Sequence, residues 1–420
     1  MQIPRSAKRA GAGAMVVASV LAACTFLNHH GHTSASKLGD TTHPAERGSP
    51  TEALVAACGA SGELTLEGRR LIGRRPYLQQ VTATGALVGL VASPHALFVD
   101  VTLPDGTSVT SAPAEIEETR TEPAQGRRQM WAKLDGLEPD TTYCYTLGNT
   151  SGDLSERIGF RTAPAADDTR PIRILAVGDS GSGDGEQHLL FEQMKSVPWE
   201  MMIHTGDIAY DTGTLAQFED HVFGVYGAVL RHLPLFPSPG NHDYKQLDGA
   251  AYRDVFNLPG DSGERWYSYD WGRIHFAALD TNSDYTTQAA WLDADLAATD
   301  LPWRIVYLHA PPYSSGNHGS DTRLRAALAP VLEKHGVQLV LAGHDHDYER
   351  MHPQRGTYYI VTGGGGRGTY SVGESSFTAF SEEVIHFTYL EVGVDEMIVH
   401  AIDATGTEFD SVVIPRTREL

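Results

Sequence analysis

Five apolar segments between residues 172 and 347 each end abruptly in polar residues, and this pattern most constrains the fold. The segments are IRILAVGD, EMMIHTGD, LPLFPSPGNHD, RIVYLHAPP and VQLVLAGHDHD. Each has the length of a strand, and helical stretches such as EQHLLFEQMKS and residues 214–232 separate some of them. Strands that alternate with helices indicate βαβ units and a largely parallel sheet. Because ligands bind at the carboxyl ends of such strands, we expect the polar residues to meet there.

The residues at these strand ends are of the types that bind metal ions. They are Asp179, Asp207, Tyr210, Asn241, His242, His309, His344 and His346. Imidazole suits iron and zinc, whereas carboxylate and carbonyl oxygens suit harder ions. Eight such groups exceed the needs of one four-coordinate ion, but two ions about 3.5–4 Å apart that share a carboxylate would use them. Any one residue alone could be a helix N-cap or a structural group, but five such clusters in one half of the chain favour a metal site.

The preceding region, residues 74–163, has a different sequence pattern. Short alternating segments such as GALVGLVAS, ALFVDVTLPDG and QMWAKLDGLEPDTTYCYTLGN are separated by Pro, Gly and Asp turns. Strands at this spacing favour a β-sandwich, and LDGLEPDTTYCYTL resembles fibronectin type III domains. The region has no cluster of catalytic residue types, so we expect it to serve in packing or positioning.

The first 24 residues have the features of an export signal. Arg5, Lys8 and Arg9 form a basic start, and the apolar stretch AGAGAMVVASVLAA that follows is short for a membrane span. It ends in LAAC, which resembles the bacterial lipobox, in which the cysteine is lipidated; the alternative is an ordinary cleavable signal peptide that contains Cys24 by chance. The first alternative predicts a lipoprotein on a membrane or cell surface, and the second a periplasmic or secreted protein. Residues 25–73 are expected to be a polar tether and lead-in.

Two further cysteines, Cys58 and Cys144, remain after Cys24. An even pair in an exported chain favours one disulfide, and two separate buried thiols are the alternative.

The charge balance limits the partners. The formal net charge is −21, with 53 acidic and 32 basic residues. Such a chain is a poor partner for nucleic acid, whose backbone is bound by clustered lysine and arginine. A small phosphorylated substrate remains compatible with this net charge, because the positive charge of a bound metal ion can locally outweigh the negative field of the whole protein.

The ordered motifs GDSG, GDIAY, GNHD, VYLH and GHDH resemble those of the calcineurin-like metallophosphoesterase superfamily, and within it the purple acid phosphatases. The family pattern is Asp-x-Gly, Gly-Asp-x-x-Tyr, Gly-Asn-His-Asp or -Glu, Val-x-x-His and Gly-His-x-His. The flanking segments RRPYLQ, GHDHDYER and YYIVTGGGG also resemble the family, so the likeness covers roughly residues 74–414. It implies a catalytic domain over residues 171–414 with two mixed β-sheets flanked by helices, after an N-terminal β-sandwich.

The resemblance implies two metal ions and two substrate-side histidines. One ion would be held by Asp179, Asp207, Tyr210 and His346, and the other by Asp207, Asn241, His309 and His344. The family's first ion is ferric, and its second is ferrous iron, zinc or manganese. His242 and His318 match the histidines that meet the substrate or the leaving group.

These assignments predict an acid phosphatase that hydrolyses phosphate monoesters. Two cations lower the pKa of a bound water, so a metal-bound hydroxide would attack phosphorus while the ions neutralise phosphoryl charge. His242 or His318, as imidazolium, would protonate the leaving alkoxide, which favours mildly acidic pH. The alternative is a metallophosphodiesterase acting on nucleotides or other diesters; Tyr210 favours the monoesterase, because the family's diesterase branches generally lack that tyrosine. A surface binding protein with a degenerate site is disfavoured by the complete ligand set.

Several residues near the motifs have structural interpretations. We expect Asp243 to orient a histidine, and Asp345 to point away from the ligand histidines if that stretch is extended. Asp347 either orients His346 or is solvated. Arg350 and Arg367 either meet a substrate phosphate or pair with surface acids.

Overall fold

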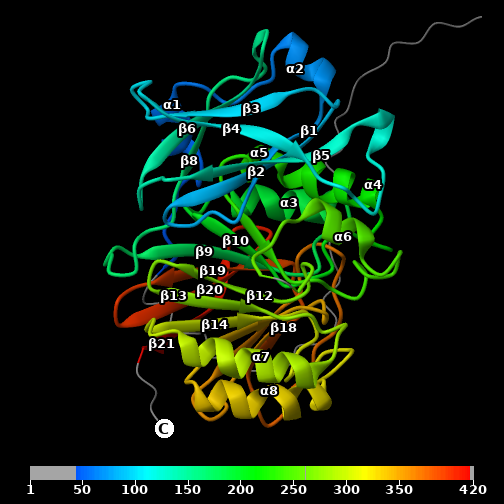
Figure 1. Ribbon diagram of the computed structural model, residues 1–420. Helices are drawn as coiled ribbons and strands as arrows, with labels where there is room; N and C mark the ends of the chain where they lie inside the picture. Colours follow the sequence, from blue (N-terminus) through cyan, green and yellow to red (C-terminus); the bar gives the residue numbers. More distant parts are fainter. Residues whose placement is uncertain (1–43, 261, 417–420) are drawn as a thin grey trace, which may run out of the picture. The chain divides into compact units, whose positions relative to one another are not determined.

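The computed structural model describes residues 44–416 except residue 261 (Figure 1). The predicted signal peptide, Cys24 and the first part of the tether lie outside these described residues. Within residues 44–416, no helix combines the length and the apolar character needed to cross a bilayer.

The N-terminal part of the fold is an all-antiparallel β domain, residues 72–161. Its strands are β1 (Ile72–Gln79), β2 (Gly85–Ala92), β3 (Leu97–Thr102), β4 (Ser108–Ile116), β5 (Arg128–Asp135), β6 (Thr142–Asn149), β7 (Gly152–Asp153) and β8 (Ile158–Arg161). They pair in the order β1-β2-β5-β4-β3-β6-β7, with β8 on β6. Alternate residues of β3 are buried, as expected for a strand with one face on a core. The predicted β domain is therefore present, while its likeness to fibronectin type III stays a prediction.

Two short helices precede this domain within the predicted lead-in. They are α1 (Glu52–Cys58) and α2 (Leu66–Leu71). A disulfide joins Cys58 at the end of α1 to Cys144 in β6, 86 residues along the chain. This bridge confirms the favoured pairing of the two cysteines.

The second domain, residues 172–415, is the α/β domain, and its first sheet has six strands. They are β9 (Ile172–Val177), β10 (Met201–His204), β11 (Leu235–Pro237), β19 (His386–Val392), β20 (Glu396–Asp403) and β21 (Glu408–Pro415). The order is β11-β10-β9-β19-β20-β21, parallel among the first three strands and antiparallel from β9 to β21. The helices between β9 and β11 are α3 (Gly185–Met194), α4 (Leu215–Gln217), the π-helical turn η2 (Phe218–Phe223) and α5 (Gly224–Leu230). Asp184 caps α3 by accepting from the backbone N–H groups of Glu186 and Gln187.

The second sheet of the α/β domain has seven strands. They are β12 (Tyr267–Trp271), β13 (Ile274–Ala278), β14 (Trp303–Tyr307), β15 (Leu339–Ala342), β16 (Tyr348–Met351), β17 (Tyr358–Thr362) and β18 (Thr378–Glu382), ordered β12-β13-β14-β15-β17-β16-β18. The remaining helices are α6 (Ala250–Val255), α7 (Tyr285–Ala298) and α8 (Thr322–Lys334), and η1 (Ala124–Gly126) lies in the β domain. Helices α7 and α8 lie side by side (Figure 1) and bury leucines such as Leu292 and Leu328 in one core with Val306 and Val340.

The five strands singled out in the sequence are divided between these two sheets. Strands β9, β10 and β11 belong to the first sheet, and β14 and β15 to the second. The carboxyl ends of strands from the two sheets meet within the α/β domain. There, the backbone N–H of Gly178, after β9, donates to the carbonyl of Thr362 at the end of β17 at 2.9 Å. Strand periodicity alone indicated one largely parallel sheet, whereas the two mixed sheets implied by the family resemblance are the ones observed.

Candidate metal centre

Three residues of the predicted site occupy sharp turns directly after their strands. Asp179, Asp207 and His344 each follow a glycine and have φ angles of 57°, 55° and 73°. This left-handed conformation costs a non-glycine residue on the order of 1–2 kcal/mol, and such strained residues can mark functional sites. The turns direct the three side chains away from their own strands and into the space where the two sheets meet.

Two glycines of the motifs are required by close approach. A Cβ on Gly240 would lie 2.1 Å from the backbone nitrogen of Asp207, and a Cβ on Gly343 would lie 2.4 Å from Oδ2 of Asp179. The glycines of GNHD and GHDH therefore allow the loops to pack against the two aspartates.

The first predicted ligand group is assembled around Tyr210. Its Oη donates to Oδ1 of Asp179 at 2.9 Å and lies 3.0 Å from Nε2 of His346. Nε2 of His346 is itself 3.5 Å from Oδ1 of Asp179. Tyr210 is only 3% exposed, so these contacts are shielded from solvent.

The second group surrounds Nε2 of His309. That nitrogen lies 3.0 Å from Oδ1 of Asn241 and 3.1 Å from Nδ1 of His344. Nδ1 of His309 is 3.0 Å from the carbonyl of Thr205, to which it donates, so in the neutral ring Nε2 carries the lone pair. A lone pair that faces an amide oxygen and a second imidazole is the arrangement that a cation stabilises.

Asp207 lies between the two groups. Its Oδ1 accepts from the backbone N–H of His242 at 2.7 Å, and its Oδ2 lies 3.5 Å from Nε2 of His309. Ligand atoms of Asp207, Asp179 and His309 are all within 4.8 Å of one another, and all three residues are buried. This position suits a carboxylate shared between two ions.

The charges of the site favour a bound cation. Burial raises the pKa of Tyr210 well above its ordinary value, and the Asp179 and Asp207 carboxylates raise it further. Burial also opposes ionisation of Asp207, but attraction to His309 holds the pKa of Asp207 below its usual range. Burial alone would lower the pKa of His309, yet the same two carboxylates raise it to about 10. A positive charge is thus stabilised between buried acids, and the donor set fits metal ions.

The two predicted substrate-side histidines lie beside these groups. The ring of His242 is 4.4 Å from the Tyr210 ring, and its Nε2 is 3.9 Å from Oδ2 of Asp207. The ring of His318 stacks on that of His344 at 4.2 Å. The structure thus brings both next to the cluster, and their catalytic role stays a prediction.

Sequence reasoning missed Tyr370, which also borders the cluster. Its ring stacks on His346 at 4.2 Å and lies 5.7 Å from the ring of His318. It belongs to no motif, and its position shortly after the run Gly363–Gly366 was the only available signal.

Acidic neighbours of the motifs support loops. Asp243 accepts from the backbone N–H groups of Ile208, Ala209 and Gly240, so it holds the loop after Asp207 and does not orient a histidine as expected. Asp345 accepts from the backbone N–H of His318 at 2.6 Å. Its expected orientation depended on an extended stretch, but residues 344–347 form no strand and His344 has a φ of 73°.

Asp347 fits neither interpretation offered for it. The side chain is buried and takes no hydrogen bond from any described residue, so it is neither solvated nor bound to His346. Burial and the nearby Asp345 and Glu349 raise its pKa to about 8.

The two arginines differ in their relation to the site. Arg350 pairs with the buried Asp410, at 2.6 Å, and is committed to the fold. Arg367 pairs with Asp211 at 2.6 Å, and its guanidinium lies 5.2 Å above the centre of the Tyr210 ring. Only Arg367 borders the cluster.

Comparisons with known proteins find matches for both domains. Residues 172–348 match the calcineurin-like phosphoesterase family, and residues 90–162 match the purple acid phosphatase N-terminal domain. The chain is 30% identical over 281 residues to purple acid phosphatase 23 of Arabidopsis thaliana, covering 56% of this chain and 61% of that protein. It is 27% identical over 288 residues to acid phosphatase type 7 of Homo sapiens, covering 57% and 65%. The chain thus spans less than two thirds of these relatives.

A solved structure shares the fold. The purple acid phosphatase PPD1 isolated from yellow lupin (Lupinus luteus) seeds superposes with a TM-score of 0.72 at 21% identity, covering 81% of this chain and 74% of that chain. Both domain matches fall on the domains described above. The chain therefore has one domain that matches the calcineurin-like phosphoesterase family and one that matches the purple acid phosphatase N-terminal domain, and it is similar to purple acid phosphatases over both.

Proposed function

We propose that the protein is an acid phosphatase with a two-metal centre that hydrolyses small phosphate monoesters. The observation that carries this proposal is the convergence of two ligand groups on Asp207 at the strand ends of two sheets. The matched domains and the acid phosphatase relatives support the same activity.

The proposed centre divides its ligands as the motifs suggest. Asp179, Tyr210 and His346 would hold a ferric ion, and Asn241, His309 and His344 would hold ferrous iron, zinc or manganese, with Asp207 shared. When bound, the ions supply Lewis acidity and neutralise charge on the phosphoryl group.

The remaining residues of the site would move protons and shape the entrance. His242 has a side chain that is 24% exposed, and it would protonate a leaving alkoxide while remaining next to Asp207. His318 is held against His344 and offers a second donor. Tyr370 covers one face of His346 and would exclude water from that side.

The direct test is metal analysis with a visible spectrum of the purified protein. Iron at about one or two ions per chain, with a broad violet band that is absent from Tyr210→Phe, is expected, because a trivalent ion stabilises the phenolate that the buried carboxylates otherwise disfavour. A colourless protein that contains only zinc or manganese would overturn the ferric assignment. An Asp207→Asn variant as active as the parent would overturn the two-metal mechanism.

A metallophosphodiesterase is the second candidate, because the same centre can attack a diester. Tyr210 favours the monoesterase, and its Oη lies within the ligand group. Initial rates on nitrophenyl phosphate and bis-nitrophenyl phosphate separate the two: we expect the monoester to be faster, and the reverse preference would support the diesterase.

We also propose that the protein is exported, as a lipoprotein attached through Cys24 or as a periplasmic or secreted enzyme. The basic start, the short apolar stretch and LAAC support this, and the Cys58–Cys144 disulfide suits an oxidising compartment. Contact with a membrane would then be limited to the lipid anchor. Mass spectrometry of the mature N-terminus tests both forms; an unprocessed Met1 would contradict export.

A further inference from the structure

The π-helical turn η2 lies between the β domain and the loops of the metal centre. It spans six residues, Phe218–Phe223, within the connection from β10 to β11. Such turns are rare and occur frequently at functional sites. No residue of η2 is among the proposed metal ligands. Any role of η2 at the site must therefore be indirect, through its contacts with other segments.

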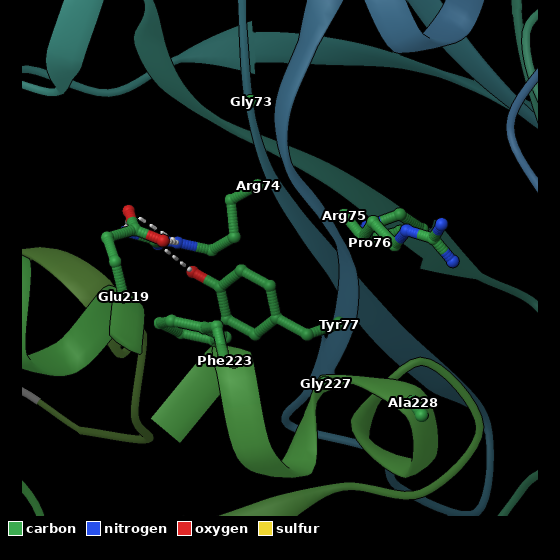
Figure 2. A pocket seen from close by; sticks show the side chains of 10 residues that line it. Gly73, Arg74, Arg75, Pro76, Tyr77, Glu219, Phe223, Gly227 and Ala228 are labelled. Atoms are coloured by element: carbon green, nitrogen blue, oxygen red, sulfur yellow. Dashed lines mark hydrogen bonds and ion pairs between the residues drawn. The ribbon is translucent and has the colours of Figure 1, made fainter. Parts of the chain in front are cut away.

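One side of η2 is fixed by the β domain. Arg74 of β1 is 3% exposed, and its Nη2 contacts Oε1 of Glu219 in η2 at 2.6 Å, with Nε 3.1 Å from both carboxylate oxygens. Gln129 of β5 accepts from the same guanidinium at 2.8 Å, and the ring of Phe223 lies 4.2 Å beneath it. Figure 2 shows the pair at the wall of a cavity of about 360 Å³. Removing the Glu219 carboxylate would leave the buried Arg74 guanidinium without its acidic partner.

The other side of η2 is bound to the loop that follows Asp179. Nδ1 of His221 lies 2.8 Å from the carbonyl oxygen of Gly181, to which it donates. The same carbonyl accepts from the backbone N–H of Tyr210 at 2.8 Å. The imidazole also packs on Gly183, where a Cβ would lie 2.5 Å from the ring. One carbonyl therefore joins η2 to the two loops that carry Asp179 and Tyr210.

We propose that the β domain positions the Asp179 and Tyr210 loops through η2. Arg74 holds Glu219, and His221, two residues further along, holds the carbonyl of Gly181. The consequence for a metal rests on the proposed function, but the positioning itself concerns only the chain. Arg74, Glu219 and His221 are positioning residues, and this gives the β domain a role beyond packing.

A second ion pair between the domains provides a matched control. Nη1 of Arg120, in the β domain, lies 3.2 Å from Oδ1 of Asp254 in α6. Asp254 is otherwise bound by the backbone of Arg120 and by Thr121, so it makes no hydrogen bond to the loops of Asp179 or Tyr210. Arg120→Gln weakens a contact between the same two domains but leaves the hydrogen bonds of η2 to Arg74 and Gly181 in place, as well as the packing of Tyr252 in α6 on Phe218 in η2.

The test is hydrogen–deuterium exchange on metal-free protein. In Glu219→Gln and in His221→Ala, we expect the amide of Tyr210 and the peptide covering residues 180–184 to exchange several-fold faster than in the parent. His221→Asn should restore slow exchange, because its carboxamide places a donor where Nδ1 lies. Arg120→Gln should keep the parental exchange rates in these segments, even if it lowers the melting temperature as much as Glu219→Gln or His221→Ala does. Parental rates in Glu219→Gln, or equal acceleration in Arg120→Gln, would overturn the proposal.

Iron-loaded protein supplies a second measurement. Glu219→Gln should shift or weaken the violet band and release iron to a chelator several-fold faster than Arg120→Gln does. A parent without iron or phosphatase activity would contradict the proposed function, and the exchange rates of the metal-free proteins would still decide the role of η2. An active, iron-containing parent whose η2 variants exchange at parental rates would contradict the role of η2 alone.

Discussion

At the scale of single residues, two buried histidines with raised pKa values show how local contacts distinguish a candidate metal ligand, His309, from a histidine in a structural ion pair, His275. Nε2 of His309 faces other possible ligands, and a metal can replace its proton. His275 instead has both ring nitrogens occupied by acids, with Nδ1 2.7 Å from Asp270 and Nε2 2.8 Å from Asp295. Burial opposes its charge, but these carboxylates raise the pKa of His275 to about 9.

His275 should therefore make stability depend on pH. Because its pKa is about 9 in the fold against an ordinary 6.5, its stabilising effect is complete below pH 6.5 and is lost as the pH rises through 9. At about 1.4 kcal/mol per unit of pKa difference, the effect is on the order of 3.5 kcal/mol. Urea unfolding at pH 6 and pH 10 should show His275→Gln to be less stable than the parent at pH 6 and close to it at pH 10. An equal difference at both values would contradict this account.

At the scale of elements, helix α1 depends on its covalent and packing contacts. It has seven residues, and its N-cap Thr51 makes no side-chain capping bond. So short a helix is unstable alone. Leu54 and Cys58 are its buried residues, and the disulfide to β6 holds it against the β domain.

Replacing both cysteines with serine should destabilise the β domain. The bridge closes a loop of 86 residues, and loss of such a bridge raises the entropy of the unfolded chain at a cost of about 2–4 kcal/mol in stability. The midpoint of urea unfolding should fall accordingly, while reductant should lower the parent's midpoint and leave that of the double variant unchanged. A double variant with the parental midpoint would show that α1 is held by packing alone.

At the scale of the whole molecule, the candidate metal ligands come from both sheets of the α/β domain. Asp179, Asp207 and Asn241 follow strands of the first sheet, and His309 and His344 follow strands of the second. An ion that binds this folded site and not the unfolded chain stabilises both sheets by linkage.

Removal of metal should therefore lower the melting temperature of the α/β domain. Free ion at 100 times its dissociation constant stabilises a fold by about 2.7 kcal/mol, and chelation removes that contribution. Calorimetry before chelation, after it and after metal is restored should show a reversible shift. The shift in melting temperature should be smaller in the Asp207→Asn variant. A parent whose melting temperature does not change with the chelator would contradict metal binding between the sheets.

The sequence by itself determined the residue types of the site, the β–α alternation and the order of the domains. Glycine followed by Asp, Asn or His at the end of an apolar run is a local signal, because the close approach of backbone loops permits no Cβ there. Four candidate ligands were accordingly identifiable before any contact between them was known: Asp179, Asp207, Asn241 and His344. The alternation of β3 similarly follows from one buried face.

Only the tertiary structure decided which distant groups face one another. The division of five strands between two sheets, the stacking of Tyr370 on His346 and the link from Arg74 through Glu219 to η2 all join segments far apart in the chain. Asp243 shows the same limit: it is adjacent to a histidine in sequence but binds the backbone after Asp207. Periodicity reports the face that a residue presents, whereas the partner on that face is set by packing of the whole chain.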